Sequence, residues 1–152
     1  MTTCTIIVVS YNSARTLKRC LDSALAQPKA QIIVLDNQSK DESNKVIKAY
    51  KNSITPILSD YNLGFGGGNN KAAMCAKGDY LIFLNPDAIL PKNFTSSVIE
   101  LFKKQPKIGI LGFKFKNSDG SLQRTGNTFP TMRSLLYENS GYHTIFPNSK
   151  AF

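Results

Sequence analysis

The chain has 152 residues, of which 41% are hydrophobic and 19% charged, and its formal net charge is +9. This length suits one globular domain with a substantial core, so we expect residues 1–152 to form a single domain. The composition excludes collagen-like, disulfide-stapled and disordered classes, and no apolar run approaches the roughly 20 residues of a membrane-spanning helix or resembles the core of a signal peptide.

The first half of the chain alternates short apolar runs with helical patterns. Ser13–Ala26 and Asp41–Tyr50 predict helices, because apolar residues recur on one face of each, and Pro28 closes the first. The predicted strands around them, rich in β-branched and aliphatic residues, are 5–9, 32–35 and the weaker 54–58.

The second half continues the alternation. Gly78 is expected to end the first helix of this half, and an Asn-Ser-Asp-Gly turn at 117–120 is expected to lead into Ser121–Thr125. The predicted elements are a helix over Gly68–Lys77, strands over Tyr80–Leu84 and Ile108–Phe115, a helix over Pro91–Lys104, a segment over Ser121–Thr125 and a last helix over Thr131–Glu138.

Strands that alternate with helices predict an α/β fold, with a mainly parallel, Rossmann-like sheet covered by helices on both faces. Its strongest strands (5–9, 32–35 and 80–84) are apolar without alternation, which is typical of strands buried on both sides. The chain contains no internal repeat and no low-complexity linker.

Polar residues follow four of the predicted strands. In parallel sheets, ligands bind beyond the carboxyl ends of the strands, where the strand order switches, so these residues should converge on one site. A single polar strand end means little, whereas four together indicate a ligand site. The four segments are Ser10-Tyr11-Asn12, Asp36-Asn37-Gln38-Ser39, the stretch from Asp60 to Asn69, and Asn85-Pro86-Asp87.

The third of these stretches contains the glycine-rich segment, residues 64–68. It is not a P-loop, because no Gly-Lys-Ser/Thr follows, and it fails the dinucleotide fingerprint, because Asn69 stands where the third glycine would fall. An NAD-type site is therefore disfavoured. Two interpretations remain: a loop whose backbone N–H groups approach a diphosphate, or a glycine-rich turn without a ligand.

Three further residues carry candidate chemistry. Asp36 can accept a hydrogen bond from a uracil- or thymine-like N–H or from a ribose, or else cap the next helix. Tyr11 can stack on a nucleobase, or simply be half-buried at a strand end. Asp87, in a turn stiffened by proline, can coordinate Mg²⁺ or Mn²⁺ that binds a diphosphate, or else cap that turn.

Taken in order, four blocks of sequence resemble the nucleotide-binding half of glycosyltransferase family 2, whose members have the GT-A fold, and rhamnosyltransferase-type members in particular. Residues 119–131 also resemble a stretch that such enzymes carry. The four blocks are Val8-Val9-Ser10-Tyr11-Asn12, Val34-Leu35-Asp36-Asn37-Gln38-Ser39, the stretch from Asn62 to Asn69, and Phe83-Leu84-Asn85-Pro86-Asp87.

The resemblance implies inverting, metal-assisted transfer of a sugar from a nucleoside diphosphate sugar, UDP- or dTDP-linked, to a saccharide or lipid-linked acceptor. By position in the motifs, Asp36 would hold the base, and Asp87 would contact Mg²⁺ or Mn²⁺. The nucleotide-sugar site implied in this way comprises Ser10, Tyr11, Asn12, Asp36, Asn62, Gly64, Asn85 and Asp87.

Two departures from the family pattern matter. Asn85 stands at the first position of the D-x-D-type motif, so one carboxylate is missing there. The acidic residue that acts as general base in the family lies well downstream, and none of Glu100, Asp119 and Glu138 resembles it. We therefore expect a donor-binding domain that lacks the acceptor-binding part. A non-catalytic nucleotide-sugar-binding module that needs a partner chain is the alternative.

The remaining features give general expectations. Three cysteines without C-x-x-C spacing (Cys4, Cys20 and Cys75) predict reduced thiols buried in the core of a cytoplasmic protein, and the lone His143 predicts a surface or packing role. The charge of +9 either attracts an anionic partner or solvates helices. Basic residues are spread along the chain, which argues against nucleic acid and leaves a peripheral location at the inner face of the membrane open. The sugar, the base and the oligomeric state stay open.

Overall fold

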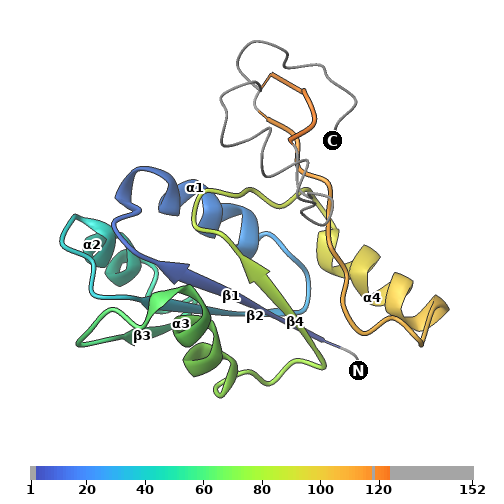
Figure 1. Ribbon diagram of the computed structural model, residues 1–152, viewed down its shortest axis with the longest axis horizontal. Coiled ribbons are helices and arrows are strands. Elements are labelled where there is room, and N and C mark those ends of the chain that lie inside the picture. The colour runs from blue at the N-terminus through green and yellow to red at the C-terminus, as the bar shows by residue number, and fades with distance from the viewer. Residues whose placement is uncertain (1–2, 118, 124–152) are drawn as a thin grey trace, which may run out of the picture. The chain divides into compact units, whose positions relative to one another are not determined.

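A computed structural model describes residues 3–117 and 119–123 of the chain (Figure 1). The chain divides into two compact units, residues 1–108 and 109–152, and every helix and strand among the described residues lies in the first. The strands are β1 (Cys4–Ser10), β2 (Ala30–Asp36), β3 (Thr55–Leu58) and β4 (Tyr80–Leu84). The helices are α1 (Ala14–Leu25), α2 (Ser43–Ala49), α3 (Gly64–Ala73) and α4 (Phe94–Lys104).

The four strands form one parallel sheet in the order β3-β2-β1-β4. The chain moves outward from β1 through β2 to β3, and then crosses to the other side of β1 to form β4. Figure 1 shows α1 and α2 on one face of the sheet and α3 on the other. The α/β class with a parallel, Rossmann-like sheet and helices on both faces is confirmed.

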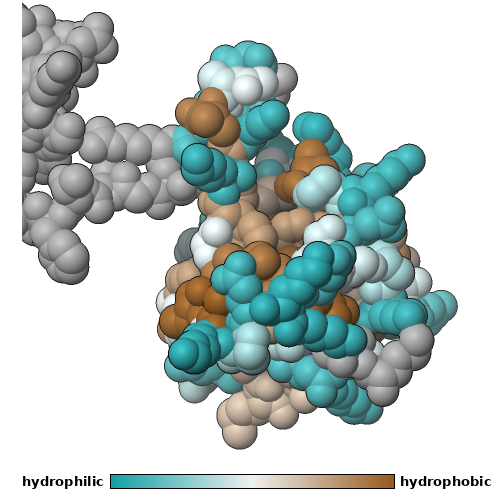
Figure 2. Space-filling model, turned by 90° about the vertical axis from the view of Figure 1, so that its right-hand side faces the viewer, coloured by the Kyte–Doolittle hydropathy of each residue, from teal (hydrophilic) through white to brown (hydrophobic). Residues whose placement is uncertain are grey.

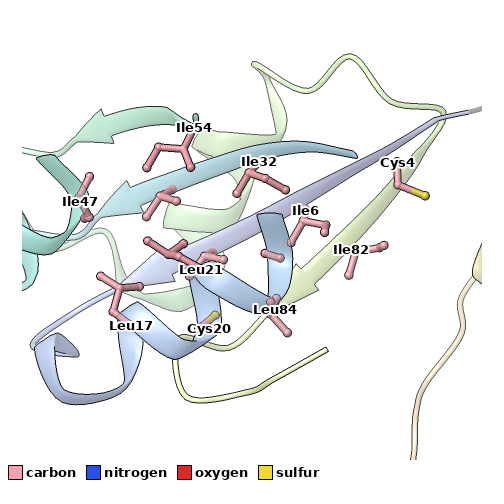
Figure 3. Close-up of a cluster of buried hydrophobic side chains, with 13 residues drawn as sticks. Cys4, Ile6, Leu17, Cys20, Leu21, Ile32, Ile47, Ile54, Ile82 and Leu84 are labelled. Atoms are coloured by element: carbon pink, nitrogen blue, oxygen red, sulfur yellow. The ribbon is translucent and has the colours of Figure 1, made fainter. Parts of the chain in front are cut away.

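Side chains alternate across β1 and β2 and so build two cores. One side of each strand contributes Ile6, Val8, Ile32 and Val34 to the cluster beneath α1 and α2, and Figure 3 shows Leu17 and Leu21 of α1 lying against it. The opposite side contributes Ile7, Val9, Ile33 and Leu35 to a smaller cluster beneath α3. All eight strand residues are buried, as the unalternated apolar runs predicted for these two strands.

The expectation that β4 is also buried on both sides is wrong. Its side chains alternate between buried Ile82 and Leu84 on the α1 face and exposed Leu81 and Phe83 on the α3 face. The reason is that α3 covers β1 and β2 but not the edge strand β4. Such apolar side chains contribute hydrophobic patches to the surface, and Figure 2 shows patches of this kind between hydrophilic side chains on the face that it draws.

Three other expectations need correction. Residues 108–115 form no strand, and the isolated bridge that follows them joins Lys116, outside the segment, to Leu122. The fourth helix begins at Phe94 rather than Pro91, since Asn93 before it has a left-handed backbone with φ of 58°. Cys75 is exposed, whereas Cys4 and Cys20 are buried as expected.

The expected turn at 117–120 forms in the second unit. The Gly120 N–H donates to the Asn117 carbonyl over 3.0 Å, and Gly120 has φ of +84°, which glycine adopts without strain. The expected helix over 131–138 and His143 lie outside the described residues. That residues 1–152 form one domain stays a prediction. Within the described residues, no helix is both long and apolar enough to cross a bilayer.

Candidate functional site

The carboxyl ends of the four parallel strands lie along one edge of the sheet, where Ser10 is the register partner of Asp36 and Asp36 that of Leu58. The chain places β2 and β3 on one side of β1 and then β4 on the other side, so the strand order switches between β1 and β4. A switch of this kind opens the crevice in which α/β proteins bind ligands. The fold therefore brings the four polar segments to one edge.

Asp36 lies at the end of β2 and is only 2% exposed. Its Oδ2 accepts hydrogen bonds from the Ser39 backbone N–H (3.0 Å) and from Asn44 Nδ2 (3.2 Å). Its Oδ1 is buried and has no hydrogen-bond partner among the residues that the structure describes. One carboxylate oxygen therefore stabilises the turn after β2, and the ligand-binding role of Asp36 stays a prediction.

Ser10 is fully buried beside Asp36, and its hydroxyl also lacks a partner within the described part of the chain. Its backbone carbonyl accepts the N–H of Asn37 over 2.8 Å, which ties the ends of β1 and β2 together. Buried polar atoms are hydrogen-bonded in roughly 90% or more of cases, so two unpaired oxygens on neighbouring strands call for an explanation. A bound ligand with N–H or O–H groups supplies one.

Asn44 on α2 belongs to the same group, although sequence reasoning missed it. Its Nδ2 donates to Asp36, and its own Oδ1 is a third buried oxygen that has no partner in residues 3–117 and 119–123. Its position on a short polar helix carries no sequence signal, because only the packing of α2 brings it to the end of β2.

The loop after β1 contains Tyr11 and Asn12. The Tyr11 side chain is available to a ligand, whereas the Asn12 side chain forms a hydrogen bond within the protein. The Tyr11 side chain is 49% exposed, so its ring is free to stack on a flat ligand. Asn12, whose φ is +50°, donates its N–H to Ser39 Oγ (3.0 Å) and accepts the Lys40 N–H at its Oδ1 (2.7 Å). The Asn12 side chain therefore joins the loops after β1 and β2.

The glycine-rich segment lies within α3, and the expected helix start at Gly68 is four residues too late. Gly64 has φ of +69°, and its N–H donates to Asn62 Oδ1 over 2.8 Å. Within the described part of the chain, the N–H groups of Phe65 and Gly66, also at this helix end, have no acceptor. Two unpaired donors at a helix N-terminus favour an anion.

Two glycines of this segment have different surroundings. A Cβ on Gly68 would lie 2.9 Å from Val9 Cγ1, so Gly68 allows α3 to pack closely on β1. A Cβ on Gly66 would meet nothing within 4 Å. The space around Gly66 is therefore open to a ligand.

Asn85 and Asp87 follow β4, and both are exposed. The Asn85 carbonyl accepts the Ala88 N–H over 3.0 Å and the Cys20 thiol over 3.4 Å. Asp87 accepts no hydrogen bond from any residue that the structure describes, which argues against the turn-cap interpretation. Burial raises the pKa of Cys20 to about 12, and the negative charge of Asp87 contributes to this shift. The hydrogen bond from the Cys20 thiol to the Asn85 carbonyl holds the turn after β4 beside α1.

A metal ion fits this site only if a bound ligand supplies part of its coordination. No group of three His, Cys, Asp or Glu side chains that could hold one exists among residues 3–117 and 119–123. Asp87 is a single free carboxylate, and Mg²⁺ commonly binds one or two carboxylates together with substrate phosphates and water. The residues present therefore fit a metal shared with a bound diphosphate, and not one held by protein ligands alone.

The candidate general bases are poorly suited to that role. Glu100 on α4 forms an exposed ion pair with Lys104 (2.6 Å), which holds the pKa of Glu100 below its usual range. The pKa of Asp119, in the second unit, is lowered by a hydrogen bond from the Ser121 hydroxyl. Glu138 lies outside the described residues. That neither Glu100 nor Asp119 acts as base stays a prediction.

Comparison with known proteins gives a family match over nearly the whole chain. The model of the family described as Glycosyl transferase family 2 matches residues 5–151. An uncharacterized glycosyltransferase of Nostoc sp. is 27% identical, with 93% of this chain and 52% of that protein aligned. The O-antigen chain rhamnosyltransferase WbaN of Salmonella anatum is 28% identical over 77% of this chain and 38% of its own length. The chain thus spans between about a third and a half of such relatives.

Solved structures share the fold. TarS residues 1–349 of S. aureus in complex with UDP has a TM-score of 0.63 and 23% identity over 69% of this chain and 33% of that chain. The mannosyltransferase PcManGT of Pyrobaculum calidifontis, in complex with GDP-Man and Mn²⁺, has a TM-score of 0.60 and 23% identity, over 70% of this chain and 33% of its own. The GT-A type of fold is therefore confirmed.

Proposed function

This chain belongs to glycosyl transferase family 2, and we propose that it binds a nucleoside diphosphate sugar at the carboxyl edge of its sheet. In this proposal it forms the donor-binding part of an inverting enzyme that transfers the sugar to a saccharide or lipid-linked acceptor. The enzyme would work in the cytoplasm, either free or peripherally at the inner face of the membrane.

The observation that carries the proposal is the pair of buried, unpaired oxygens at the ends of β1 and β2, Ser10 Oγ and Asp36 Oδ1. Leaving a buried acceptor unpaired costs about 1–3 kcal/mol, and a ligand that donates hydrogen bonds there removes this cost. The imide N–H of uracil or thymine is a donor of the right kind, and the exposed Tyr11 ring belongs to the loop that follows Ser10. We therefore favour UDP or dTDP as the nucleotide.

The diphosphate would lie at the start of α3 and near Asp87. The unpaired N–H groups of Phe65 and Gly66 point to an anion at the helix end, where the helix dipole adds to the attraction. Asp87 would hold Mg²⁺ or Mn²⁺ together with the phosphate oxygens, and the metal would stabilise the diphosphate as leaving group. Asn85, at the first position of the D-x-D-type motif, leaves Asp87 as the one carboxylate of that motif.

A second function, donor binding without efficient transfer, is favoured by the surroundings of the acidic residues. Among the described residues after Asp87, Glu100 is paired with Lys104 and Asp119 is bound by Ser121. A positioned general base contributes typically about 10²–10⁴-fold to such a reaction. If no residue of this chain supplies such a base, water should hydrolyse the donor slowly. Transfer of the sugar to an acceptor should then be slower still.

The test of nucleotide binding is calorimetric titration of the 152-residue chain with UDP, dTDP and GDP, each with Mn²⁺ and with EDTA. UDP or dTDP should bind, and Asp36→Asn should weaken binding about tenfold or more, since a hydrogen bond to a charged group contributes about 1.5–3 kcal/mol. Asp79→Asn, at the opposite end of the sheet, is the charge-matched control and should bind like the wild type. If none of the three nucleotides binds at millimolar concentration, the proposal is wrong.

A second experiment separates transfer from donor binding alone. The chain is incubated with radiolabelled sugar nucleotides and with saccharide and lipid-linked acceptors, and free sugar and transferred sugar are counted. Efficient transfer would show that this chain, or a second copy of it, supplies the general base. Free sugar without transfer would support the donor-binding module.

A further inference from the structure

Asn37 connects three parts of the candidate site and is itself buried, with 2% of its surface exposed. Its backbone N–H donates to the Ser10 carbonyl at the end of β1. Its side-chain Oδ1 accepts the N–H of Leu63 over 2.7 Å. Its Nδ2 donates to Asn62 Oδ1 over 2.8 Å and to the Gly64 carbonyl over 3.2 Å. One side chain at the end of β2 thus binds the three residues that lead into α3.

These bonds determine which N–H groups of the first turn of α3 stay free. The four N–H groups at a helix start have no partner within the helix. Here Asn37 Oδ1 takes the N–H of Leu63, and Asn62 Oδ1, itself held by Asn37 Nδ2, takes the N–H of Gly64. Within the described residues, the N–H groups of Phe65 and Gly66 remain without acceptors.

Asn37 also stabilises a backbone shape that the local sequence does not favour. Gly64 has φ of +69°, and four of the first five residues of α3 are glycine, each of which destabilises a helix. No side chain within this first turn supplies a cap. The helix start is held instead by hydrogen bonds from outside α3, and Asn37 supplies or supports each of them.

We infer that Asn37 is a positioning residue for the diphosphate: it holds the start of α3 so that the N–H groups of Phe65 and Gly66 point together to one anion. The inference rests on the proposed function, since it names the residue that orders part of the same site. It assigns Asn37 no contact with the nucleobase. Loss of the side chain should therefore weaken binding of a nucleoside diphosphate much more than binding of the nucleoside.

The test compares UDP with uridine as probes, by calorimetry or NMR titration, on the wild type, Asn37→Ala and Asn69→Ala. Asn69 of α3, which is 7% exposed, is the matched control. Its Nδ2 donates to the Phe65 carbonyl within the helix. The loss of its side chain therefore removes a hydrogen bond of similar kind without breaking the link between α3 and β2. Asn37→Ala should reduce the affinity for UDP about tenfold or more and change the affinity for uridine less than about twofold. The reason is that two charge-assisted hydrogen bonds, from the N–H groups of Phe65 and Gly66 to the diphosphate, depend on the geometry of this helix start. Asn69→Ala should leave the ratio of the two affinities as in the wild type.

A second measurement does not depend on nucleotide binding. Hydrogen exchange of the Leu63 and Gly64 amides should be faster in Asn37→Asp, which keeps the volume of the side chain but places a carboxylate oxygen against Asn62 Oδ1 and the Gly64 carbonyl. Asn69→Asp, with the same added charge, should leave exchange at these two amides unchanged.

The outcomes separate the two proposals. If the wild type binds UDP and Asn37→Ala loses affinity for UDP and uridine equally, or for neither, the positioning role is wrong and the proposed function stands. Unchanged exchange at Leu63 and Gly64 in Asn37→Asp likewise overturns the positioning role. If the wild type binds none of UDP, dTDP and GDP, both proposals are wrong.

Discussion

Ser10 and Asp36 are register partners at the carboxyl ends of β1 and β2, and each has one buried side-chain oxygen that finds no hydrogen-bond partner in the described residues. The pair lies where the parallel sheet brings two strand ends together, and Asn44 adds a third unpaired oxygen from α2. A protein that stabilised only its own fold would gain from pairing or removing such groups. An arrangement that lowers the stability of the free protein in this way is typical of a ligand-binding site.

The first prediction concerns Ser10→Ala. Its hydroxyl has no partner among the described residues, so the substitution should leave the free energy of unfolding unchanged or raise it by up to about 1–3 kcal/mol. Nucleotide affinity should fall about 2- to 12-fold, the equivalent of one hydrogen bond of about 0.5–1.5 kcal/mol. Urea denaturation and calorimetry measure the two effects. Ser59→Ala is the control, because buried Ser59 donates to the Tyr61 carbonyl over 2.8 Å and its loss should destabilise the fold.

The second prediction uses two glycines of one helix. Gly68→Ala should lower the free energy of unfolding by about 1–3 kcal/mol, because the new Cβ would overpack against Val9. Gly66→Ala has open space and should stabilise α3 by up to about 1 kcal/mol, through helix propensity. If the ligand uses that space, Gly66→Ala should nevertheless bind UDP more weakly. Stability unchanged in Gly68→Ala would contradict the close packing of α3 on β1.

The third prediction concerns Asp87→Asn. Because the carboxylate accepts no hydrogen bond from the described residues, the free energy of unfolding should change by less than about 0.5 kcal/mol. The difference in UDP affinity between Mn²⁺ and EDTA, measured by calorimetry, should shrink, since the variant loses a metal-ligand carboxylate. Asp79→Asn is the control and should keep the full metal effect. A stability loss with an unchanged metal effect would favour the turn-cap role instead.

Removing the charge at position 87 should also act on Cys20. Burial and the Asp87 charge together raise the pKa of the Cys20 thiol to about 12, with burial the larger cause. In Asp87→Asn the thiol pKa should fall but stay well above its usual range. Alkylation of the native protein at increasing pH, read by mass spectrometry, measures this shift, and exposed Cys75 should react first in both proteins.

The fourth prediction is a pH dependence of stability that involves Asp41. A hydrogen bond from the Ser43 hydroxyl, and further ones from the backbone N–H groups of Ala14 and Ser43, hold the pKa of Asp41 below its ordinary value of 3.8. The unfolded chain therefore binds the proton more tightly, so this stabilisation is present above pH 3.8 and is lost as the pH falls through the lower folded value.

Melting temperatures between pH 6 and roughly pH 2.5 test this dependence. The wild type should lose stability on acidification, and Asp41→Asn should lose less, because it has no carboxylate to protonate. Ser43→Ala should change the profile in the same direction, since it removes the largest cause of the shift. Superimposable profiles for the wild type and Asp41→Asn would contradict the assignment.

Local sequence patterns determined most of the fold of the first unit. The apolar runs around Ile6, Ile33 and Ile82 became strands, and the amphipathic pattern around Leu21 became α1, because the period of apolar residues reports directly on strand or helix geometry. The same patterns placed Asp36 at a strand end and Asp87 just beyond one, since Asp36 directly follows an apolar run and Asp87 follows another after Asn85 and Pro86. Parallel pairing then brings such residues to one edge.

Tertiary structure alone decided the details of the site. Four glycines near Gly64 predict a loop by helix propensity, yet the residues are helical, because Asn37 and Asn62 bind the first turn from outside it. Likewise, Tyr80–Leu84 reads as a strand buried on both sides, yet Phe83 is exposed, since α3 does not extend over β4. Propensity and periodicity are properties of neighbouring residues along the chain. A hydrogen bond from Asn37 to Gly64, or the reach of one helix over a sheet, depends on contacts between distant segments, and only the folded chain brings those together.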